Sequence, residues 1–514
     1  MSTAPPGPAT TVADLMSSPV ITASPGETVA TAAGRMAEAG VGSIVILDGD
    51  RPVGILTERD LVRLAADLTP SSEARLSDWA TSDPDTIPPD TEPSAAMERM
   101  EERGYRHLPV VEDGRLVGVV SLRDLVRVAR IQPVDRPAAE VPPGLEGVAV
   151  AETRVGDVRG REGFFHYRQY SAPELAAKRT FEDVWHLLLQ GDLPEEAAAK
   201  AFAEEIRPLR AIPDDVATVL PDIARAGDRF DPLDALRAAY SILSLDFLPW
   251  LDVDTARLRG QAVRTCAVFP TITAALYRLR SGQDPVPPRD DLGHAANYLY
   301  MMRGEPPAEE HARALETYLI LTIDHGFNAS TFAARVITST GADLGSAVVG
   351  ALGALSGPLH GGAPSRALDM LDEIGSPERA DRWLREAVES GKRLMGFGHR
   401  VYRTDDPRST MLRDVAESLD GDRVALAKQV ETKAVDVLRE LKPGRELYPN
   451  VEFYAGIVLD LIGMPRELFT PTFAVSRVVG WCTHVMEQAA DNRLIRPGAR
   501  YVGPEPPQPV PAEG

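Results

Sequence analysis

The spacing of apolar residues divides this chain into an N-terminal part with strands and a longer helical part. In the first 130 residues, short runs rich in Val and Ile alternate with amphipathic stretches, which is typical of strands between helices. Residues 145–170 are strand-like and short, which favours a small sheet. Beyond them, Leu- and Ala-rich segments have helical spacing, and we expect helices over 181–189, 195–207, 232–243, 256–279 and 308–323. The pattern predicts a multidomain chain, α/β first and mainly α afterwards.

The N-terminal part contains an internal repeat. Residues 52–62 (PVGILTERDLV) recur 64 positions later as 116–126 (LVGVVSLRDLV), and 36–40 (MAEAG) recur as 100–104 (MEERG). Each copy reads as an amphipathic helix, two strands joined by an acidic-glycine turn, and a second helix. Because one copy is too small to bury much core, we expect the two copies to pack face to face.

Proline-rich segments flank and separate these parts. We expect residues 1–10 and 503–514 to be disordered, and residues 131–143 to form a semi-rigid linker. The N-terminus lacks a basic segment followed by an apolar one, so no secretory signal is expected.

Composition narrows the class of protein. The 514 residues include 55 Lys and Arg against 76 Asp and Glu, a formal net charge of −21. We expect no nucleic-acid partner, because affinity for a phosphate backbone comes from clustered positive charge. Two distant cysteines, Cys266 and Cys482, indicate a reducing compartment without a disulfide framework. No apolar run has the length of a membrane span, so we expect a cytoplasmic protein without a membrane partner.

Three motifs in the helical part carry candidate chemistry. His360 stands between a Gly-Pro break and a Gly-Gly pair in GPLHGGA, and His399 follows a glycine-flanked turn in GFGHRVY. Glu452 opens a helical pattern in the mostly apolar NVEFYAG. Two imidazoles and a carboxylate offer a base for a C–H bond next to a carbonyl and donors for the developing oxyanion. No P-loop, zinc spacing or dinucleotide fingerprint occurs, so neither a metal nor a redox cofactor is expected.

These motifs, followed by FTP at 469–471 and RVVGW at 477–481, resemble the citrate synthase family in order and spacing. The resemblance runs from about Gly144 to Tyr501. It implies a homodimer or higher oligomer of a mainly α enzyme whose small domain closes over bound oxaloacetate. By resemblance, the large domain comprises 144–361 and 466–502, and the small domain comprises 362–465.

The family condenses an acyl-CoA with a 2-oxo acid, usually acetyl-CoA with oxaloacetate, and then hydrolyses the thioester. By resemblance, Glu452 removes a proton from the acyl methyl group, and His360 donates to the thioester oxygen as the enol forms. His399 donates to the ketone oxygen of oxaloacetate during attack. Most family members have Asp at the position of Glu452. We expect activity to survive this difference, because a carboxylate remains.

The resemblance also supplies the substrate ligands. Arginine forks suit the two carboxylates of oxaloacetate. The candidate oxaloacetate ligands are His325, Arg408, Arg477 and, across a dimer interface, Arg496. The CoA thioester is a substrate, and no cofactor is implied. Its candidate ligands are Met395, Gly396, Phe397, Gly398 and Arg403. Pro364 and Ser365 replace the Asn-Glu that often follows GPLHGGA, a difference that bears on the local CoA contacts.

The repeat, which includes RHLPVV at 106–111, resembles a tandem pair of CBS domains over 11–70 and 75–130. In that family the cleft between the copies often holds an adenine nucleotide. The matching hydroxyl and aspartate positions are Thr57 with Asp60, and Ser121 with Asp124. A hydroxyl beside a helix N-terminus favours phosphate, and aspartate accepts from ribose hydroxyls. The same residues can instead cap the helices that follow them.

We therefore predict a citrate synthase-type enzyme that is regulated by an adenine nucleotide at its CBS pair. One alternative is a 2-methylcitrate synthase that uses propionyl-CoA, because one methylene group discriminates weakly between substrates. A second alternative is a catalytically weak relative that senses nucleotides.

Overall fold

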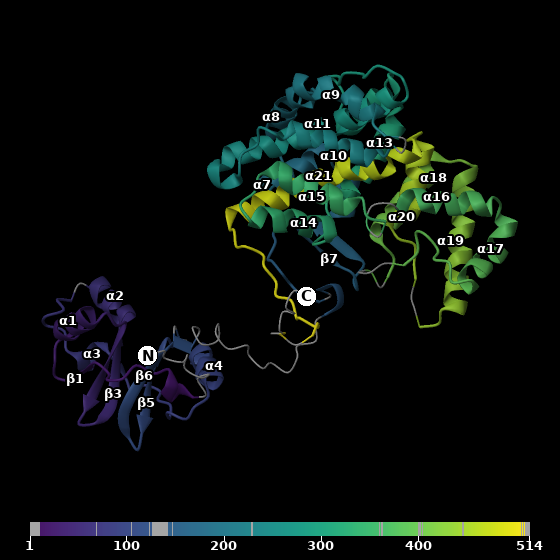
Figure 1. Ribbon diagram of the computed structural model, residues 1–514. Helices are drawn as coiled ribbons and strands as arrows, with labels where there is room; N and C mark the ends of the chain where they lie inside the picture. The colour runs from purple at the N-terminus through teal and green to yellow at the C-terminus, as the bar shows by residue number, and fades with distance from the viewer. Residues whose placement is uncertain are drawn as a thin grey trace, which may run out of the picture. The chain divides into compact units, whose positions relative to one another are not determined.

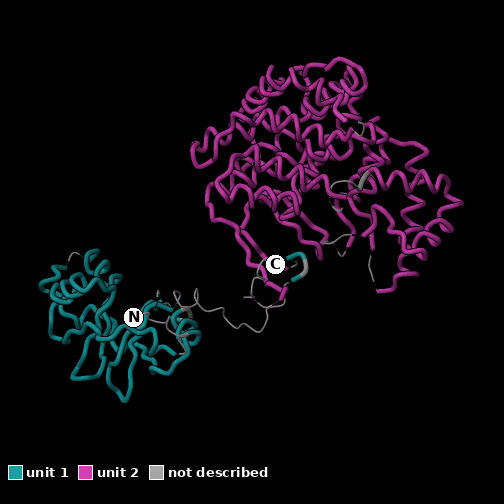
Figure 2. Tube along the Cα trace, viewed as in Figure 1, with its two compact units in different colours: residues 1–146 teal, residues 147–514 magenta. Residues whose placement is uncertain are grey.

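The computed structural model describes residues 11–67, 69–103, 105–122, 124–125, 142–145, 147–227, 230–358, 360, 363–398, 402, 404–444, 447–504, 506 and 508. The chain divides into two compact units, residues 1–146 and 147–514 (Figure 2), and each is described by itself. The segments predicted to be disordered or linking lie outside the described residues, apart from 142–143 and a few positions between 503 and 508.

The first unit contains both copies of the repeat. Each copy has a helix, then two antiparallel strands joined at a glycine in the left-handed region, Gly49 with φ +64° and Gly114 with φ +80°. This arrangement confirms the predicted acidic-glycine turns. The elements are η1 (Val12–Asp14), β1 (Thr22–Ala23), α1 (Val29–Ala39), β2 (Ser43–Asp48), β3 (Arg51–Thr57), α2 (Glu58–Ala66), α3 (Leu76–Trp79), β4 (Thr81–Ser82), α4 (Pro93–Arg103), β5 (His107–Glu112) and β6 (Arg115–Ser121).

The two copies exchange their leading segments. Strand β4 lies near the start of the second copy but pairs with β3 of the first, and Ser17 lies near the start of the first copy but bridges to Val119 of the second. The buried side chains follow the same rule, because Val12 belongs to the core of the second copy and Leu76 to the core of the first. Each core is therefore completed by residues from the other copy.

The second unit has a small sheet and is otherwise helical (Figure 1). The sheet contains β7 (Gly156–Arg159), β8 (Phe164–Tyr167) and β9 (Tyr170–Ser171). The helices are α6 (Ala172–Lys178), α7 (Phe181–Gln190), α8 (Glu196–Ile206), α9 (Asp214–Arg225), α10 (Pro232–Leu243), α11 (Thr255–Arg280), α12 (His294–Arg303), α13 (Glu309–Thr322), α14 (Ala329–Ser339), α15 (Leu344–Leu355), α16 (Ala363–Ile374), α17 (Pro377–Glu389), α18 (Pro407–Leu419), α19 (Asp422–Leu441), α20 (Val451–Leu461) and α21 (Phe469–Ala490).

The predicted helices match these elements to within about a turn, and α10 begins and ends where it was predicted. The Asp231 side chain accepts from the N–H groups of Leu233 and Asp234, and Pro232 occupies the first turn, where it needs no hydrogen bond. The strand prediction was only partly correct. The sheet begins at Gly156, and residues 148–153 have no regular secondary structure.

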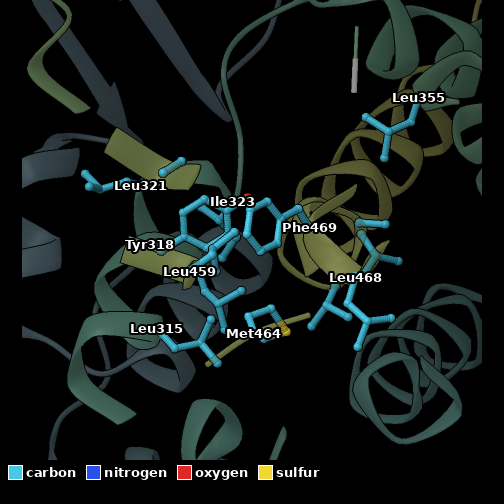
Figure 3. Packing of buried hydrophobic residues seen from close by; sticks show 14 of the residues in the cluster. Leu315, Tyr318, Leu321, Ile323, Leu355, Leu459, Met464, Leu468 and Phe469 are labelled. Carbon is cyan, nitrogen blue, oxygen red and sulfur yellow. The ribbon is translucent and has the colours of Figure 1, made fainter. Parts of the chain in front are cut away.

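Helix α21 lies at the centre of the helical unit. It contacts α7, α10, α11, α13, α14 and α15, and its side chains are buried on almost every face. Figure 3 shows Phe469 at its start beside Tyr318 of α13 and Leu459 of α20. Helices α16 to α20 gather on one side of the unit (Figure 1), and their assignment to a separate closing domain stays a prediction.

One glycine lets α21 approach the end of α13 closely. A Cβ atom on Gly480 would lie 2.4 Å from the carbonyl oxygen of Ile323 and 3.1 Å from Oδ1 of Asp324. Positions 477, 480, 481, 484 and 488 share one face of α21, because helical neighbours recur every three or four residues. Any side chain at Gly480 would therefore push this face away from the turn after α13.

We expect Gly480→Ala to lower the free energy of unfolding by about 3 kcal/mol, because the added methyl group meets a backbone oxygen that cannot rotate away. Gly353→Ala is the matched control. Gly353 lies within α15, and a Cβ atom added there would have no atom within 4 Å, so alanine should stabilise the chain by about 1 kcal/mol. Urea unfolding, monitored by tryptophan fluorescence, measures the free energy of unfolding of both variants. An equal change in the free energy of unfolding for the two variants would contradict the close approach of α21 to Ile323.

Candidate active site

His360 lies in the connection between α15 and α16, as the Gly-Pro and Gly-Gly breaks predict. Its N–H donates to the carbonyl of Gly357, at 2.9 Å. Its Nε2 lies 2.8 Å from Ser330 Oγ and 3.3 Å from the Ser330 backbone N. Ser330 Oγ also accepts from Nε1 of Trp481 on α21, at 3.1 Å. The imidazole is thus held against the start of α14 and, through Ser330, against α21.

The contact with the Ser330 backbone favours one tautomer of His360. A backbone N–H can only donate, so Nε2 accepts from Ser330 and a neutral ring has its proton on Nδ1. Burial, helped by the positive charge of Arg477, lowers the pKa of His360 to about 4. The ring is therefore a neutral hydrogen-bond donor near pH 7.

Arg477 is a buried guanidinium to which the described residues offer no ion pair. Its side chain is 2% exposed, lies 4.5 Å over the ring of Phe473, and donates from Nε to the carbonyl of Thr322 at 2.8 Å. Among the described residues, no carboxylate lies within ion-pair distance of it. Burial lowers the pKa of Arg477 to about 10, which the negative charge of Asp324 opposes and the positive charge of Arg408 reinforces.

Arg408 is equally buried but paired. Asp406, the N-cap residue of α18, accepts from the backbone N, Nε and Nη2 of Arg408 at 3.0, 3.0 and 2.8 Å. The same carboxylate accepts from the backbone N of Val451 at 3.0 Å, which joins α18 to the start of α20. Burial alone would lower the pKa of Arg408, but Asp406 outweighs it and the pKa rises.

Glu452 lies one residue farther along α20. Its backbone N donates to Oδ1 of Asn450 at 3.0 Å, and its side chain is half-buried. Burial raises the pKa of Glu452 to about 7, although the charges of Arg408 and Arg393 act to lower it. A carboxyl group with a pKa near neutrality can both take up and release a proton at pH 7.

The predicted CoA-binding loop is attached to the same helix start. The carbonyl of Gly398 accepts from Nδ2 of Asn450 at 2.9 Å, and the carbonyl of Gly396 accepts from its backbone N at 2.8 Å. Gly396 has φ +82°, and a Cβ atom there would lie 2.8 Å from Cβ of Phe453. Asn450 therefore fixes Glu452 and this loop together. Met395 and Phe397 lie in the same turn.

The electrostatic interactions indicate that the candidate residues lie close together. Burial raises the pKa of Tyr318 on α13 well above its usual range, the charges of Arg477 and Arg408 lower it, and the charge of Glu452 raises it further. His325 Nε2 lies 3.1 Å from the hydroxyl of Tyr402, whose ring is 5.8 Å from the guanidinium of Arg408. The structure thus groups His325, Arg408, Arg477, Glu452 and, through Arg477, His360.

The remaining predicted site residues of this unit are His399, Arg403 and Arg496. His399 and Arg403 lie outside the described residues, as do Gly361 and Gly362. Arg496 is exposed in the segment after α21 and makes no contact with the group in the part of the chain that is described.

In the first unit, each hydroxyl residue that was predicted to contact a nucleotide forms hydrogen bonds with the aspartate three positions after it. The backbone N and Oγ1 of Thr57 donate to Asp60 at 2.9 and 2.8 Å, and the N and Oγ of Ser121 donate to Asp124 at 3.2 and 2.5 Å. These bonds confirm the expected helix caps. The nucleotide site itself stays a prediction.

Several supporting residues were missed. Ser330 lies in the stretch Asn328-Ala329-Ser330, which reads as an ordinary helix cap, and nothing in it points to His360 thirty residues away. Asn450 lies inside the motif NVEFYAG, and Asp406 lies two residues before the candidate ligand Arg408, so their neighbours carried the signal. Among the described residues, no group of His, Cys, Asp and Glu has the arrangement of a metal site. None of the helices in the described ranges is long and apolar enough to cross a membrane.

Family models and known proteins match most of the chain. A family model described as "Citrate synthase, C-terminal domain" matches residues 144–498, and the CBS domain model matches 12–67 and 76–130. The citrate synthase of Deinococcus radiodurans is 40% identical over 361 residues, which cover 70% of this chain and 95% of that protein. The 2-methylcitrate synthase of Mycobacterium tuberculosis is 40% identical over 370 residues, or 71% and 91% of the two chains.

Solved structures show the same similarity. Citrate synthase from Thermotoga maritima superposes with a TM-score of 0.64 at 38% identity and covers 72% of this chain and 97% of that one. The ternary complex of citrate synthase from Thermoplasma acidophilum with carboxymethyl coenzyme A and oxaloacetate gives 0.67 at 33% identity, with coverage of 73% and 99%.

The raised pKa of Glu452 has a consequence for stability. Between pH about 4.5 and about 7, the folded chain keeps a proton that the unfolded chain gives up, so this carboxyl destabilises the fold as the pH rises. Glu452→Gln stays neutral and should gain roughly 2 kcal/mol relative to wild type between pH 5 and pH 8. Urea unfolding at the two pH values measures the gain. A difference that does not change with pH would contradict the raised pKa.

Proposed function

Since this chain belongs to the citrate synthase family, we propose that it condenses acetyl-CoA with oxaloacetate and hydrolyses the product thioester to citrate and CoA. Its identity of about 40% to curated citrate synthases makes it an acyltransferase of the citrate synthase type. The observation that best supports the substrate is the buried guanidinium of Arg477, which has no ion-pair partner among the described residues and feels the positive charge of Arg408. A dianion would relieve the repulsion between them.

Oxaloacetate binds first in this proposal. Arg477 takes one carboxylate and Arg408 the other, while His325 contacts the substrate from the turn after α13. Arg408 remains bonded to Asp406 through Nε and Nη2, which fixes the direction of its fork. Arg496 would reach the site from a second copy of the chain.

Glu452 then removes a proton from the methyl group of the acetyl thioester. The pKa of this carboxyl group, about 7, lies near the working pH, where proton transfer in both directions is efficient. The neutral His360 donates from Nδ1 to the thioester oxygen as the enol forms, with Nε2 held by Ser330. The side chain of Glu452 is one methylene longer than the aspartate of most relatives, and its carboxylate provides the same base.

Carbon–carbon bond formation follows. The enol carbon attacks the ketone carbon of oxaloacetate, and His399 donates to the ketone oxygen, which becomes the hydroxyl of the product. Water then attacks the thioester carbonyl, the C–S bond breaks, and CoA leaves as the thiol. Closure of residues 362–465 over 144–361 and 466–502 would exclude water until the carbon–carbon bond has formed. Residues Met395 to Gly398 and Arg403 would bind the CoA part.

Self-association is supported by the C-terminal segment. Residues 491–502 have no regular secondary structure, and Leu494, Tyr501 and Val502 are 56%, 70% and 83% exposed. An extended segment with exposed apolar side chains is suited to covering a second copy, and Arg496 lies within it. We therefore propose a homodimer or higher oligomer in which this segment completes the partner's site.

The identity of the acyl group distinguishes the proposed citrate synthase from the 2-methylcitrate synthase alternative. Relatives of both names, citrate synthase and 2-methylcitrate synthase, are 40% identical to this chain. An assay that follows release of the CoA thiol from acetyl-CoA or propionyl-CoA with oxaloacetate separates them. We expect acetyl-CoA to have the higher kcat/KM. Preference for propionyl-CoA would establish the 2-methylcitrate alternative, and no thiol release from either would establish the catalytically weak relative.

His360→Ala should lower kcat in this assay by at least about 100-fold, because the donor to the developing oxyanion is lost. The melting temperature should stay close to wild type, since the side chain bonds only to Ser330 among the described residues. His311→Ala, at a partly exposed histidine of α13, is the control and should keep full activity. Turnover near wild type in His360→Ala would refute the assigned role.

We also propose that an adenine nucleotide in the cleft of the CBS pair changes the activity. A coupling free energy of about 1–3 kcal/mol corresponds to a change of roughly 5- to 150-fold. Steady-state kinetics with and without ATP, ADP and AMP measure it on the full chain. The double variant Asp60→Asn/Asp124→Asn keeps an oxygen for each helix cap but removes the charge, and should lose the response. An identical response in wild type and variant, or none to any nucleotide, would reject the site.

A further inference from the structure

A buried row of polar groups lies behind the turn that carries His325, and the proposed mechanism does not use it. His484 of α21 has no exposed surface and Asp324 is 1% exposed. Nε2 of His484 lies 3.3 Å from Oδ1 of Asp324. Neither atom has a hydrogen-bond partner among the described residues, so the polar group that can satisfy each of them is the other.

The far side of the His484 ring fixes its tautomer. Nη1 of Arg335 lies 3.3 Å from Nδ1 of His484 and 2.6 Å from a carboxylate oxygen of Glu487, and Nε of Arg335 donates to Gln488. A guanidinium can only donate, so Nδ1 accepts and the proton of the neutral ring is on Nε2. The ring therefore directs an N–H at Asp324.

Asp324 accepts hydrogen bonds that hold the backbone on both sides of His325. Its Oδ2 accepts from the backbone N of Gly326 at 3.1 Å, and its carbonyl accepts from the hydroxyl of Tyr167 at 3.1 Å. Gly326 has φ +60°, one of several backbone conformations open to glycine, and the hydrogen bond to Asp324 favours this one. Burial would raise the pKa of Asp324, but His484, Arg477 and the Gly326 N–H outweigh it and keep the group ionised.

The face of α21 that carries His484 also contacts the two residues that precede Asp324. Arg477 donates to the carbonyl of Thr322, and Gly480 packs against the carbonyl of Ile323. His484 is thus the third contact, one helical turn farther along, between α21 and residues 322–324.

We propose that His484 is a positioning residue for oxaloacetate binding, which orients His325 by holding the Asp324 carboxylate that fixes the turn around Gly326. The inference rests on the proposed function, because it assigns His325 to oxaloacetate. The competing interpretation is a buried histidine that only fills space and satisfies Arg335.

Two amide variants separate these interpretations. The side-chain amide of glutamine reaches as far as Nε2 of histidine, whereas that of asparagine reaches only as far as Nδ1. His484→Gln can therefore still donate to Asp324, and His484→Asn can accept from Arg335 but not reach Asp324. His294→Gln is the control for loss of a buried imidazole, because His294 is 2% exposed and stacks on Phe181 in another part of the unit.

The measurement is the dissociation constant of oxaloacetate by titration calorimetry on the full chain without acyl-CoA. We expect His484→Asn to bind oxaloacetate at least 10-fold more weakly, with His484→Gln within 3-fold of wild type and His294→Gln unchanged. The amide proton of Gly326 should also exchange with solvent at least 10-fold faster in His484→Asn alone.

If His484→Asn does not fold, Asp324→Asn replaces it. Gly326 and His484 meet different oxygens of Asp324, and asparagine has an oxygen at only one of these positions, so this variant should lose affinity in the same way. Equal affinities of the two amide variants, or of a folded Asp324→Asn and wild type, would overturn the inference. A wild-type chain that does not bind oxaloacetate would instead overturn the proposed function.

Discussion

The close packing of α21 against the end of α13 determines where the candidate site lies. At Gly480 the helix backbone is so near the carbonyl of Ile323 that no side chain fits between them. This contact sets the depth and rotation of α21 and so directs one face of the helix at the turn after α13. From that face Arg477 donates to the carbonyl of Thr322 beside the proposed oxaloacetate site, and Trp481 reaches the serine that holds His360. The packing of α21 therefore also determines where the guanidinium of Arg477 lies.

The charge balance around this turn explains why the site suits a dicarboxylate. Two buried guanidinium groups lie near each other, and Asp406 compensates only Arg408 among the described residues. An uncompensated buried cation is costly, and a protein keeps one where a ligand anion replaces the missing partner. The same surroundings bury Glu452 and raise its pKa, which suits a base that must give its proton back. The net charge of −21 of the whole chain makes such local compensation necessary.

Local signals in the sequence were enough to predict the helices and to single out the candidate site residues. Helix α10 was predictable because Asp231 and Pro232 mark its start, and Glu452 because its motif opens α20. Contacts between distant segments carry no local signal. Ser330 and Trp481 are 151 positions apart, and His484 and Asp324 meet only because α21 crosses the end of α13. The exchange of leading segments in the CBS pair was missed for the same reason, since a repeat shows that two copies exist but not which core each segment joins.

A crystal structure with oxaloacetate bound tests the central claim most directly. We predict one substrate carboxylate on the guanidinium of Arg477, the other within hydrogen-bond distance of Arg408, and the turn around His325 in contact with the ligand. An oxaloacetate molecule bound elsewhere, with the guanidinium of Arg477 still lacking an anion, would contradict it.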